Sequence, residues 1–295
     1  MIESLRNLPA PAKLNLFLHV TGRRADGYHL LETVFEFVDL CDRVHLARRD
    51  DGAIVRRNPL AGLAPEADLA VRAARLLAAE TGCRFGVEIA IDKRIPMGAG
   101  LGGGSSDAAT VLLGLNRLWE LRLDRRRLMA LGLRLGADVP AFVFGRRAFA
   151  RGIGERLRAL PGEPAWFVLV APPVAVPTAS VFGCAKLTRD TKPLKISGLS
   201  RGRSVYRGKN DLEPVACAAW PRIAEALAAL RLAADSAGAD GRLARMTGSG
   251  ACVFCPVPDE PAAAAIRKRL ARQAVGTAYS VRSLPGHPLR DWSFA

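Results

Sequence analysis

The sequence lacks any uninterrupted apolar run of about 18 residues, the length that a membrane-spanning helix needs. Its first twenty residues also lack the basic start, long apolar stretch and small-residue cleavage site of a secretory signal. We therefore expect a cytoplasmic protein with no membrane partner. The 295 residues are enough for two domains of ordinary size.

Cysteine is scarce, with six residues scattered at irregular spacings, which favours reduced thiols over a disulfide framework. Cys252 and Cys255 form a C-x-x-C pair inside the apolar, strand-like run GACVFCPV. No second pair or nearby histidine completes a zinc site there, so buried strand thiols are favoured over zinc or redox chemistry. The four histidines include no H-E-x-x-H pattern, and no metal held by a protein cluster is expected.

Lysine is rare for so basic a chain, because only seven of the 43 basic residues are lysine and 36 are arginine. A net charge of +15 raises nucleic acid as a partner. The arginines are spread along the chain and form no dense tract. We therefore expect an arginine-rich surface and no nucleic-acid partner, although a small polyanionic substrate also suits the charge. A nucleic-acid-binding protein stays open as the alternative from another class.

Hydrophobic periodicity predicts an α+β chain. Residues 12–20, AKLNLFLHV, alternate as in a strand, with Lys13 on the more polar face. Residues 68–81 have helical spacing, with Asp68 as the expected cap and Gly82 as the stop. Other expected strands cover residues 85–92, 147–157, 165–173, 251–257 and 277–284, and other expected helices cover residues 108–119, 125–136, 221–234 and 261–273.

The segment LPGEP at residues 160–164 interrupts this pattern and predicts a domain boundary. Residues 1–160 are expected to form an N-terminal ATP- and phosphate-binding domain. Residues 161–295 are expected to form a C-terminal, substrate-side domain of two α+β layers, because strands and helices alternate there. The basic segment 189–209 is expected to be a loop.

A glycine-rich stretch, PMGAGLGGGSSDAA at residues 96–109, separates an expected strand from an expected helix. A flexible linker is not favoured, because regular structure adjoins the stretch on both sides. Gly98, Gly100 and Gly103 match G-x-G-x-x-G, but the second parallel strand of a dinucleotide-binding unit is missing. No Walker sequence occurs. A structural loop and a cradle for phosphate remain.

The cradle is the favoured interpretation of this stretch. Glycines let backbone N–H groups approach an oxyanion, and the following helix N-terminus attracts negative charge. Either Ser105 or Ser106 is expected to cap that helix and to offer a hydroxyl to phosphate or to magnesium.

The same stretch resembles the phosphate loop of the GHMP kinases, a family of small-molecule kinases. The resemblance extends to PAKLNLFLHVTGRRADGYH at 11–29, LGADVPAFVFG at 135–145, KNDLE at 209–213 and TGSGACVF at 247–254. It implies a two-domain GHMP kinase architecture that uses ATP and Mg²⁺ to phosphorylate a small alcohol. The implied ATP-binding residues are Pro96, Gly98, Gly100, Leu101, Gly102, Gly103, Gly104, Ser105 and Ser106.

By this resemblance the catalytic residues are Lys13 and Asp138. Phosphoryl transfer to an alcohol needs a carboxylate or a cation beside the attacking oxygen. An ion pair between the two would lower the cost of deprotonating the substrate hydroxyl. Without the resemblance, Lys13 could equally be an exposed strand lysine and Asp138 a turn residue.

The resemblance further implies the 2-hydroxyl of 4-diphosphocytidyl-2-C-methylerythritol, an isoprenoid precursor of the non-mevalonate route, as the acceptor. Other small alcohols stay open, and a galactokinase is disfavoured because its G-E-H-x-D-Y signature is missing. Asp68 stands where related sequences usually have asparagine, so no adenine contact is carried over there. The sequence does not specify an oligomeric state. The implied substrate-binding residues are Asn15, Tyr28, His29, Phe182, Thr247, Gly248, Ser249 and Gly250.

Some of these substrate-binding residues also have purely structural alternatives. Tyr28 and Phe182 could be ordinary core aromatics, and His29 could be a turn histidine. Residues 247–250 could be a plain tight turn before a strand.

Overall fold

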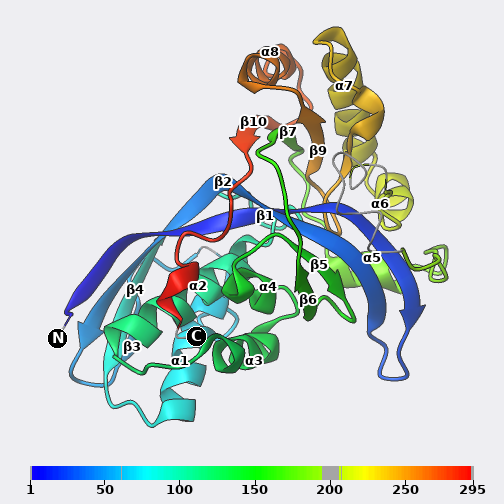
Figure 1. The fold of residues 1–295 in the computed structure, drawn as a ribbon. Coiled ribbons are helices and arrows are strands. Elements are labelled where there is room, and N and C mark those ends of the chain that lie inside the picture. The colour runs from blue at the N-terminus through cyan, green and yellow to red at the C-terminus, as the bar shows by residue number, and fades with distance from the viewer. Residues whose placement is uncertain (1, 61, 195–205, 207, 294–295) are drawn as a thin grey trace.

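Two long antiparallel strands, β1 (Ser4–Arg23) and β2 (His29–Arg49), arch across the molecule (Figure 1). They come from a computed structural model that describes residues 2–60, 62–194, 206 and 208–293. The strands pair from Ser4 opposite Ala47 to Arg23 opposite His29. The turn at Asp26-Gly27 joins them, and Gly27 has a φ of 90°, which favours glycine.

The first sheet is centred on β2, which pairs with β1 and also with two further strands, each of which has a partner of its own. Near its end β2 pairs with β4, and near its start it pairs with β5, both antiparallel. The flanking strands are β3, parallel to β4, and β6, antiparallel to β5. The bounds of these strands are Ile54–Arg56 for β3, Gly86–Asp92 for β4, Ala148–Arg151 for β5 and Arg156–Ala159 for β6.

Four helices pack below this sheet as Figure 1 is drawn: α1 (Leu69–Thr81), α2 (Gly103–Leu118), α3 (Arg125–Leu135) and α4 (Val139–Phe144). Helix α2 is central, since nearly every residue from Ser106 to Leu118 is buried. Burial of apolar surface between the helices and the sheet is the main stabilising contribution here. The core includes Phe37, Leu46, Leu77, Ile89, Leu112 and Phe142.

The second sheet has four strands in the order β10-β7-β9-β8, all antiparallel. Helices α7 and α8 pack against it and bury Ile223, Leu230, Ile266 and Leu270 with the sheet. The bounds are β7 Trp166–Ala171, α5 Thr178–Gly183, α6 Glu213–Ala219, α7 Pro221–Ser236, β8 Arg245–Met246, β9 Val253–Val257, α8 Glu260–Leu270 and β10 Thr277–Arg282, with 3-10 turns at Gly241–Leu243 and Arg290–Trp292.

A third cluster of buried side chains joins the two sheets. Phe17 and Val34 from β1 and β2 pack there with Phe167 and Phe254 from β7 and β9. The rings of Phe167 and Phe254 meet edge to face with centroids 6.0 Å apart. This cluster fixes β1 against the second sheet, and the glycine-rich stretch lies directly beside it through Leu101.

The last part of the described chain returns from the second sheet to the first. Leu284 N donates to Phe37 O at 2.8 Å, and His287 N donates to Gly145 O at 2.9 Å. His287 is almost fully buried, and burial lowers its pKa to about 3. Thus residues 284–292 contribute to the core under the first sheet, through Leu289 among others.

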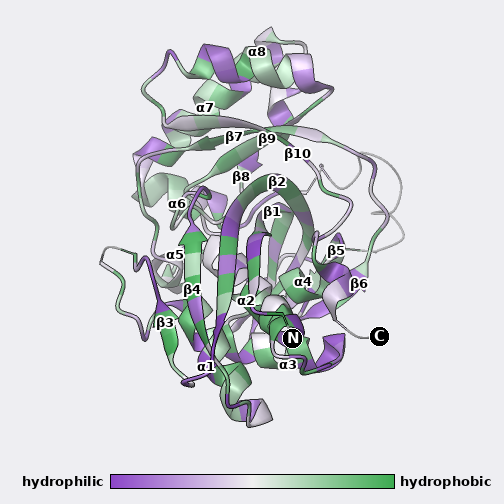
Figure 2. Ribbon diagram, turned by 90° about the vertical axis from the view of Figure 1, so that its left-hand side faces the viewer, coloured by the Kyte–Doolittle hydropathy of each residue, from purple (hydrophilic) through white to green (hydrophobic). Residues whose placement is uncertain are grey.

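Most of the elements expected from periodicity are confirmed. Helix α1 begins after Asp68, whose side chain accepts from Ala70 N, and it ends at Gly82 in the left-handed conformation. Cys252 and Cys255 are buried free thiols at and just before β9, as expected. Figure 2 shows hydrophobic segments along β2 and β4 and hydrophilic ones on α3 and α8.

Other expectations differ from the structure. Residues 139–144 form helix α4, which the sequence did not indicate. Both faces of β1 are buried over residues 12–20, so the expected polar face of this segment is not exposed. The expected loop at 189–209 lies partly outside the described residues. The boundary at 160/161 stays a prediction; β6 ends at Ala159 and β7 begins at Trp166.

No helix in the described ranges has both the length and the apolar character to cross a bilayer.

Candidate active site

A cavity of about 900 Å³ opens between the start of α2, strand β1 and helix α5. Its wall contains the glycine-rich stretch together with Tyr28, His29 and Phe182. Lys13 and Asp138 also line it. The volume is within the range of small-molecule binding sites.

Lys13 is held at the centre of this wall by three neighbours. Its ammonium donates to Asn15 Oδ1 at 2.6 Å and to Gly100 O at 3.1 Å, and it lies 3.5 Å from Asp138 Oδ2. The Lys13 side chain is 4% exposed, so an exposed strand lysine is excluded. A buried ammonium is stable only when its charge is compensated, which these oxygen atoms do. The Phe35 ring adds a cation–π contact at 5.6 Å.

Asp138 reaches Lys13 from the N-cap position of α4, where the carboxylate makes no capping hydrogen bond. One carboxylate oxygen faces the ammonium, and 36% of the side chain stays exposed. The carboxylate is therefore available on the cavity side to accept a proton or a hydrogen bond from a bound hydroxyl.

The glycine-rich stretch passes over Lys13 in a conformation that needs glycine. Gly98, Gly100 and Gly102 have φ values of 65°, 73° and 72°. Leu101 O accepts from Lys13 N at 3.0 Å, which ties the stretch to β1. A Cβ on Gly102 would stand 3.1 Å from Lys13 Cε. The backbone thus approaches the lysine as closely as a glycine allows.

The second glycine loop, residues 247–250, packs directly on the first. A Cβ on Gly100 would lie 2.3 Å from Thr247 O, and a Cβ on Gly248 would lie 2.9 Å from Gly100 O. Thr247 Oγ1 accepts from Asn15 N at 2.9 Å. The loop that follows β8 of the second sheet therefore contacts both the glycine-rich stretch and β1 of the first sheet.

Asn210 anchors this second loop, a role that the sequence did not reveal. Its Nδ2 donates to Met246 O at 2.9 Å and to Gly248 O at 2.8 Å, while its Oδ1 accepts from Leu212 N at 2.9 Å. Asn210 forms a parallel bridge with Leu18 of β1. The motif KNDLE was visible as part of the resemblance, but the loop carbonyls that Asn210 binds, those of Met246 and Gly248, lie 36 and 38 residues away in the chain.

Helix α2 begins at Gly103, and its N-cap is Gly102, with no side-chain cap. The prediction that Ser105 or Ser106 caps this helix is therefore wrong. Ser105 lines the cavity. Ser106 is fully buried inside the first turn, and its Oγ has no partner among the described residues. Of the two serines, only Ser105 is placed where a phosphate or a magnesium ion could meet it.

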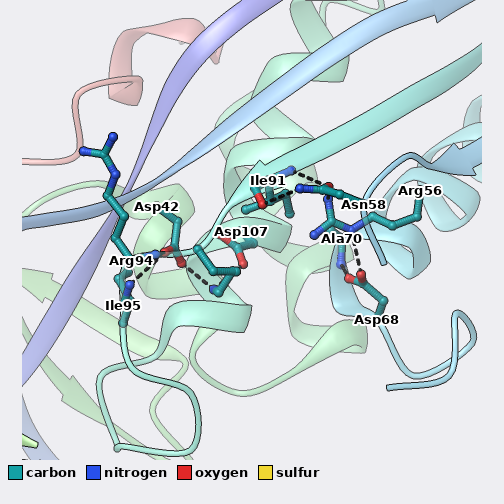
Figure 3. Close-up of polar contacts among 10 residues, drawn as sticks. Asp42, Arg56, Asn58, Asp68, Ala70, Ile91, Arg94, Ile95 and Asp107 are labelled. Atoms are coloured by element: carbon teal, nitrogen blue, oxygen red, sulfur yellow. Dashed lines mark hydrogen bonds and ion pairs between the residues drawn. The ribbon is translucent and has the colours of Figure 1, made fainter. Parts of the chain in front are cut away.

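A buried charge cluster supports the first turn of α2 from the side (Figure 3). The Lys93 ammonium contacts Asp42 and lies 2.8 Å from Asp107 Oδ2. Asp42 Oδ1 also accepts from Arg94 N and Ile95 N. Burial lowers the pKa of Lys93, but the carboxylates of Asp107 and Asp42 outweigh it and the net shift is upward.

Two carboxyl groups share a single ammonium in this cluster. Burial raises the pKa of Asp107 to about 7, against the lowering effect of Lys93 and with a further rise from Asp42. Lys93 and Asp107 line the cavity, although the sequence assigned them no role. The cluster joins the end of β4 to the start of α2 and thus fixes the glycine-rich stretch between them.

A second network fixes Asp68 on the cavity wall beside α1 (Figure 3). Asp68 accepts from Arg56 Nε at 3.1 Å and from Ala70 N at 2.9 Å. Arg56 also donates to Asn58 Oδ1 at 2.9 Å, and Asn58 pairs with both backbone groups of Ile91. The carboxylate at this position is therefore held by an arginine, an arrangement that the sequence alone did not indicate.

Three aromatic side chains, those of Tyr28, His29 and Phe182, also line the cavity. The His29 and Phe182 rings are 5.1 Å apart between centroids. Tyr28 is 58% exposed, so it is not an ordinary core aromatic. Burial, Arg189 and Arg23 lower the pKa of His29, which favours the neutral imidazole.

The residues predicted from the sequence thus converge on one cavity, with two exceptions. Ser106 and Thr247 are buried and do not line it. Thr247 instead accepts a hydrogen bond from the backbone N–H of Asn15. Within the described ranges, no three His, Cys, Asp or Glu side chains gather as potential metal ligands.

Gly103→Val is expected to raise the KM for ATP roughly tenfold or more, if ATP binds at the glycine-rich stretch. A Cβ on Gly103 would already lie 3.2 Å from Ile95 Cγ2 and 3.4 Å from Lys93 Nζ. Two further methyl groups must therefore displace these neighbours or occupy the cavity. Steady-state kinetics with varied ATP would measure the effect, with circular dichroism to confirm folding. Unchanged ATP affinity in a folded variant would place the phosphates elsewhere.

Comparisons with known proteins show which family the chain belongs to. Residues 68–146 match the family model "GHMP kinases N terminal domain", and residues 201–276 match "GHMP kinases C terminal". The chain is similar to the 4-diphosphocytidyl-2-C-methyl-D-erythritol kinase of Herminiimonas arsenicoxydans, with 53% identity over 98% of both chains. It is 52% identical to the enzyme of the same name from Aromatoleum aromaticum, over 99% of this chain and 98% of that one.

A solved structure is similar over nearly the same extent. It is a crystal structure of 4-(cytidine 5'-diphospho)-2C-methyl-D-erythritol kinase, with 37% identity and a TM-score of 0.77. The match covers 93% of this chain and 98% of that one. The two-domain α+β kinase fold expected from the sequence is thereby confirmed. The family models and the relatives that match over nearly the whole chain together show that this chain is a member of the GHMP kinases.

Proposed function

We propose that this GHMP kinase transfers the γ-phosphoryl group of ATP to the 2-hydroxyl of 4-diphosphocytidyl-2-C-methyl-D-erythritol, a step of non-mevalonate isoprenoid synthesis in the cytoplasm. The observation that carries the proposal is the position of the Lys13–Asp138 pair. The pair lines the same cavity as the glycine-rich stretch and as Tyr28, His29 and Phe182. The names of the full-length relatives support the choice of alcohol.

The glycine-rich stretch fits the polyphosphate of ATP. The N–H groups of Gly103, Gly104 and Ser105 form the first turn of α2 and have no partner within the helix. These N–H groups lie at the N-terminus of a 16-residue helix, whose partial positive charge attracts the phosphate oxygens of a bound ligand. Mg²⁺ bound with ATP would shield the phosphate charges, and the hydroxyl of Ser105 is the serine oxygen on the cavity wall.

Lys13 and Asp138 fit the transfer step. The substrate hydroxyl gives its proton to the Asp138 carboxylate as its oxygen forms a bond to the γ-phosphorus. The bond from that phosphorus to the bridging oxygen breaks, and the electron pair leaves with ADP. Lys13, fixed by Asn15 and Gly100, supplies a positive charge beside the transferred group. Because these contacts are already formed, Lys13 needs little rearrangement as charge develops in the transition state.

An ADP-release assay across candidate alcohols tests this proposal. We expect turnover with the cytidyl compound and little with free methylerythritol, mevalonate or homoserine. Comparable turnover with another alcohol would contradict the assigned acceptor. The absence of ATP-dependent turnover together with salt-sensitive RNA or DNA binding would instead favour a nucleic-acid-binding protein.

Tyr28→Ala is expected to raise the KM for the cytidyl substrate by roughly five- to 150-fold, with the KM for ATP unchanged. The reason is the loss of a stacking surface for the pyrimidine, a contribution of about 1 to 3 kcal/mol per base. The exposed Tyr28 ring has little else to stabilise, so the fold should persist. Kinetics with each substrate varied in turn would measure both constants, and an unchanged KM for the cytidyl substrate would place the base elsewhere.

A further inference from the structure

Arg189 connects the two halves of the proposed cytidyl end of the cavity. Its Nε donates to His29 Nε2 at 3.0 Å. Its Nη2 donates to Phe182 O at 3.1 Å and to Cys184 O at 2.8 Å, and its Nη1 donates to Leu187 O at 3.0 Å. One guanidinium thus binds residues from the start of β2 and from the end of α5, which are about 150 positions apart in the chain.

These contacts determine which ring nitrogen of His29 carries the proton. A guanidinium has only donors, so the nitrogen that faces it must present a lone pair. Nε2 is therefore unprotonated, and the neutral imidazole carries its proton on Nδ1. In the described part of the chain Nδ1 has no hydrogen-bond partner, and His29 lines the cavity.

The backbone contacts of Arg189 have a separate effect on Phe182. Helix α5 spans only six residues and ends at Cys184 as its C-cap. Carbonyl groups in the last turn of a helix lack partners, and an arginine that donates to them stabilises that end. The Phe182 ring, 5.1 Å from the His29 ring, is thereby held in place by the same guanidinium that orients the histidine.

We propose that Arg189 is a positioning residue, which fixes His29 as the Nδ1–H tautomer beside Phe182 so that the cavity presents a hydrogen-bond donor to the cytidyl substrate. This inference rests on the proposed function for the identity of the ligand. Arg189 itself need not touch the substrate, because it acts through His29 and α5. No described protein acceptor uses the donor at Nδ1, so it is available to an acceptor atom of a ligand in the cavity.

The first test is the tautomer in the protein without substrate. Two-bond ¹H–¹⁵N correlation spectra of ¹⁵N-histidine-labelled enzyme distinguish a protonated from an unprotonated ring nitrogen, and His29→Gln identifies the signal. We expect a protonated Nδ1 and an unprotonated Nε2 in the wild type. In Arg189→Met we expect the Nε2–H form to become populated. A wild-type His29 protonated at Nε2 would overturn the proposal, and this result does not depend on Arg189→Met being folded.

The second test separates positioning from folding through kinetics. We expect Arg189→Met to raise the KM for 4-diphosphocytidyl-2-C-methyl-D-erythritol about tenfold, with the KM for ATP changed less than about twofold. Arg189→Lys keeps a charged donor, so its KM for the cytidyl substrate is expected to lie between those of the wild type and Arg189→Met. Arg222→Met is the matched control, since Arg222 pairs with Glu225 on the surface of α7 and does not line the cavity.

The two tests distinguish a failure of this inference from a failure of the proposed function. If the wild type does not phosphorylate the cytidyl compound, the proposed function fails, whereas the tautomer is still decided in the free protein. If it does phosphorylate the compound and Arg189→Met changes neither the tautomer nor that KM, the positioning role is wrong.

Discussion

Asp138→Asn is expected to reduce kcat by about 100-fold or more while ATP affinity changes little. Asparagine keeps the size of the side chain and one oxygen, but it cannot take up the proton of the substrate hydroxyl. The change also removes the negative charge 3.5 Å from the Lys13 ammonium, which then retains only the Asn15 and Gly100 oxygen atoms. Single-turnover kinetics and ATP titration would measure the two effects separately.

Asp124→Asn provides a matched control for this variant. Asp124 is also a helix N-cap, of α3, and its carboxylate accepts from Arg127 N at 2.7 Å. Asparagine is a good N-cap, so this variant should keep both stability and activity. Normal turnover by Asp138→Asn would remove Asp138 from the chemistry, whereas equal losses in both variants would indicate a general effect on the fold.

Gly100→Ala is expected to reduce kcat/KM for ATP by about tenfold or more and to lower the free energy of unfolding by about 1 to 3 kcal/mol. The φ of Gly100 is 73°, and the new methyl group would stand 2.3 Å from Thr247 O and 3.0 Å from Gly250 O. Backbone atoms cannot rotate away as a flexible side chain can. The two glycine loops must therefore separate, and Gly100 O must shift from the Lys13 ammonium.

Gly238→Ala separates the backbone strain from the loss of contact between the loops. Gly238 has a φ of 75°, nearly that of Gly100, yet no atom lies within 4 Å of the new methyl group. Thermal unfolding and ATP kinetics of the two variants should therefore differ. If Gly100→Ala behaves like Gly238→Ala in both measurements, the contact between the loops has no part in the site.

Local signals explain why much of the fold could be predicted from the sequence. Helix α1 has a capping Asp68, helical spacing and a Gly82 stop, and all three act within a few residues of one another. Helix α4 also has an aspartate, Asp138, at its N-cap and a left-handed Gly145 at its C-cap, but the aspartate makes no capping hydrogen bond and the six apolar residues show no helical spacing. Its helical form depends on tertiary packing, which a short sequence window does not contain.

The site shows the same division between local and distant information. The glycine-rich stretch carries its own signature, and the resemblance brought Lys13 and Asp138 together. The sequence did not indicate the anchors, such as Asn210 for the second loop, because their partners are distant in the chain. Nor could it indicate that Ser106 points into the core, since a serine at the start of a helix usually acts as a cap.

The central claim is that the Lys13–Asp138 pair promotes transfer of the γ-phosphoryl group of ATP to one hydroxyl of a cytidyl alcohol. Analysis of the product tests this claim most directly. ³¹P and ¹³C NMR of a reaction with ATP and 4-diphosphocytidyl-2-C-methyl-D-erythritol would locate the new phosphate. We predict a single phosphomonoester on the 2-hydroxyl with the wild type and almost none with Asp138→Asn in the same time. A phosphate on another hydroxyl, or equal product from free methylerythritol, would contradict the account.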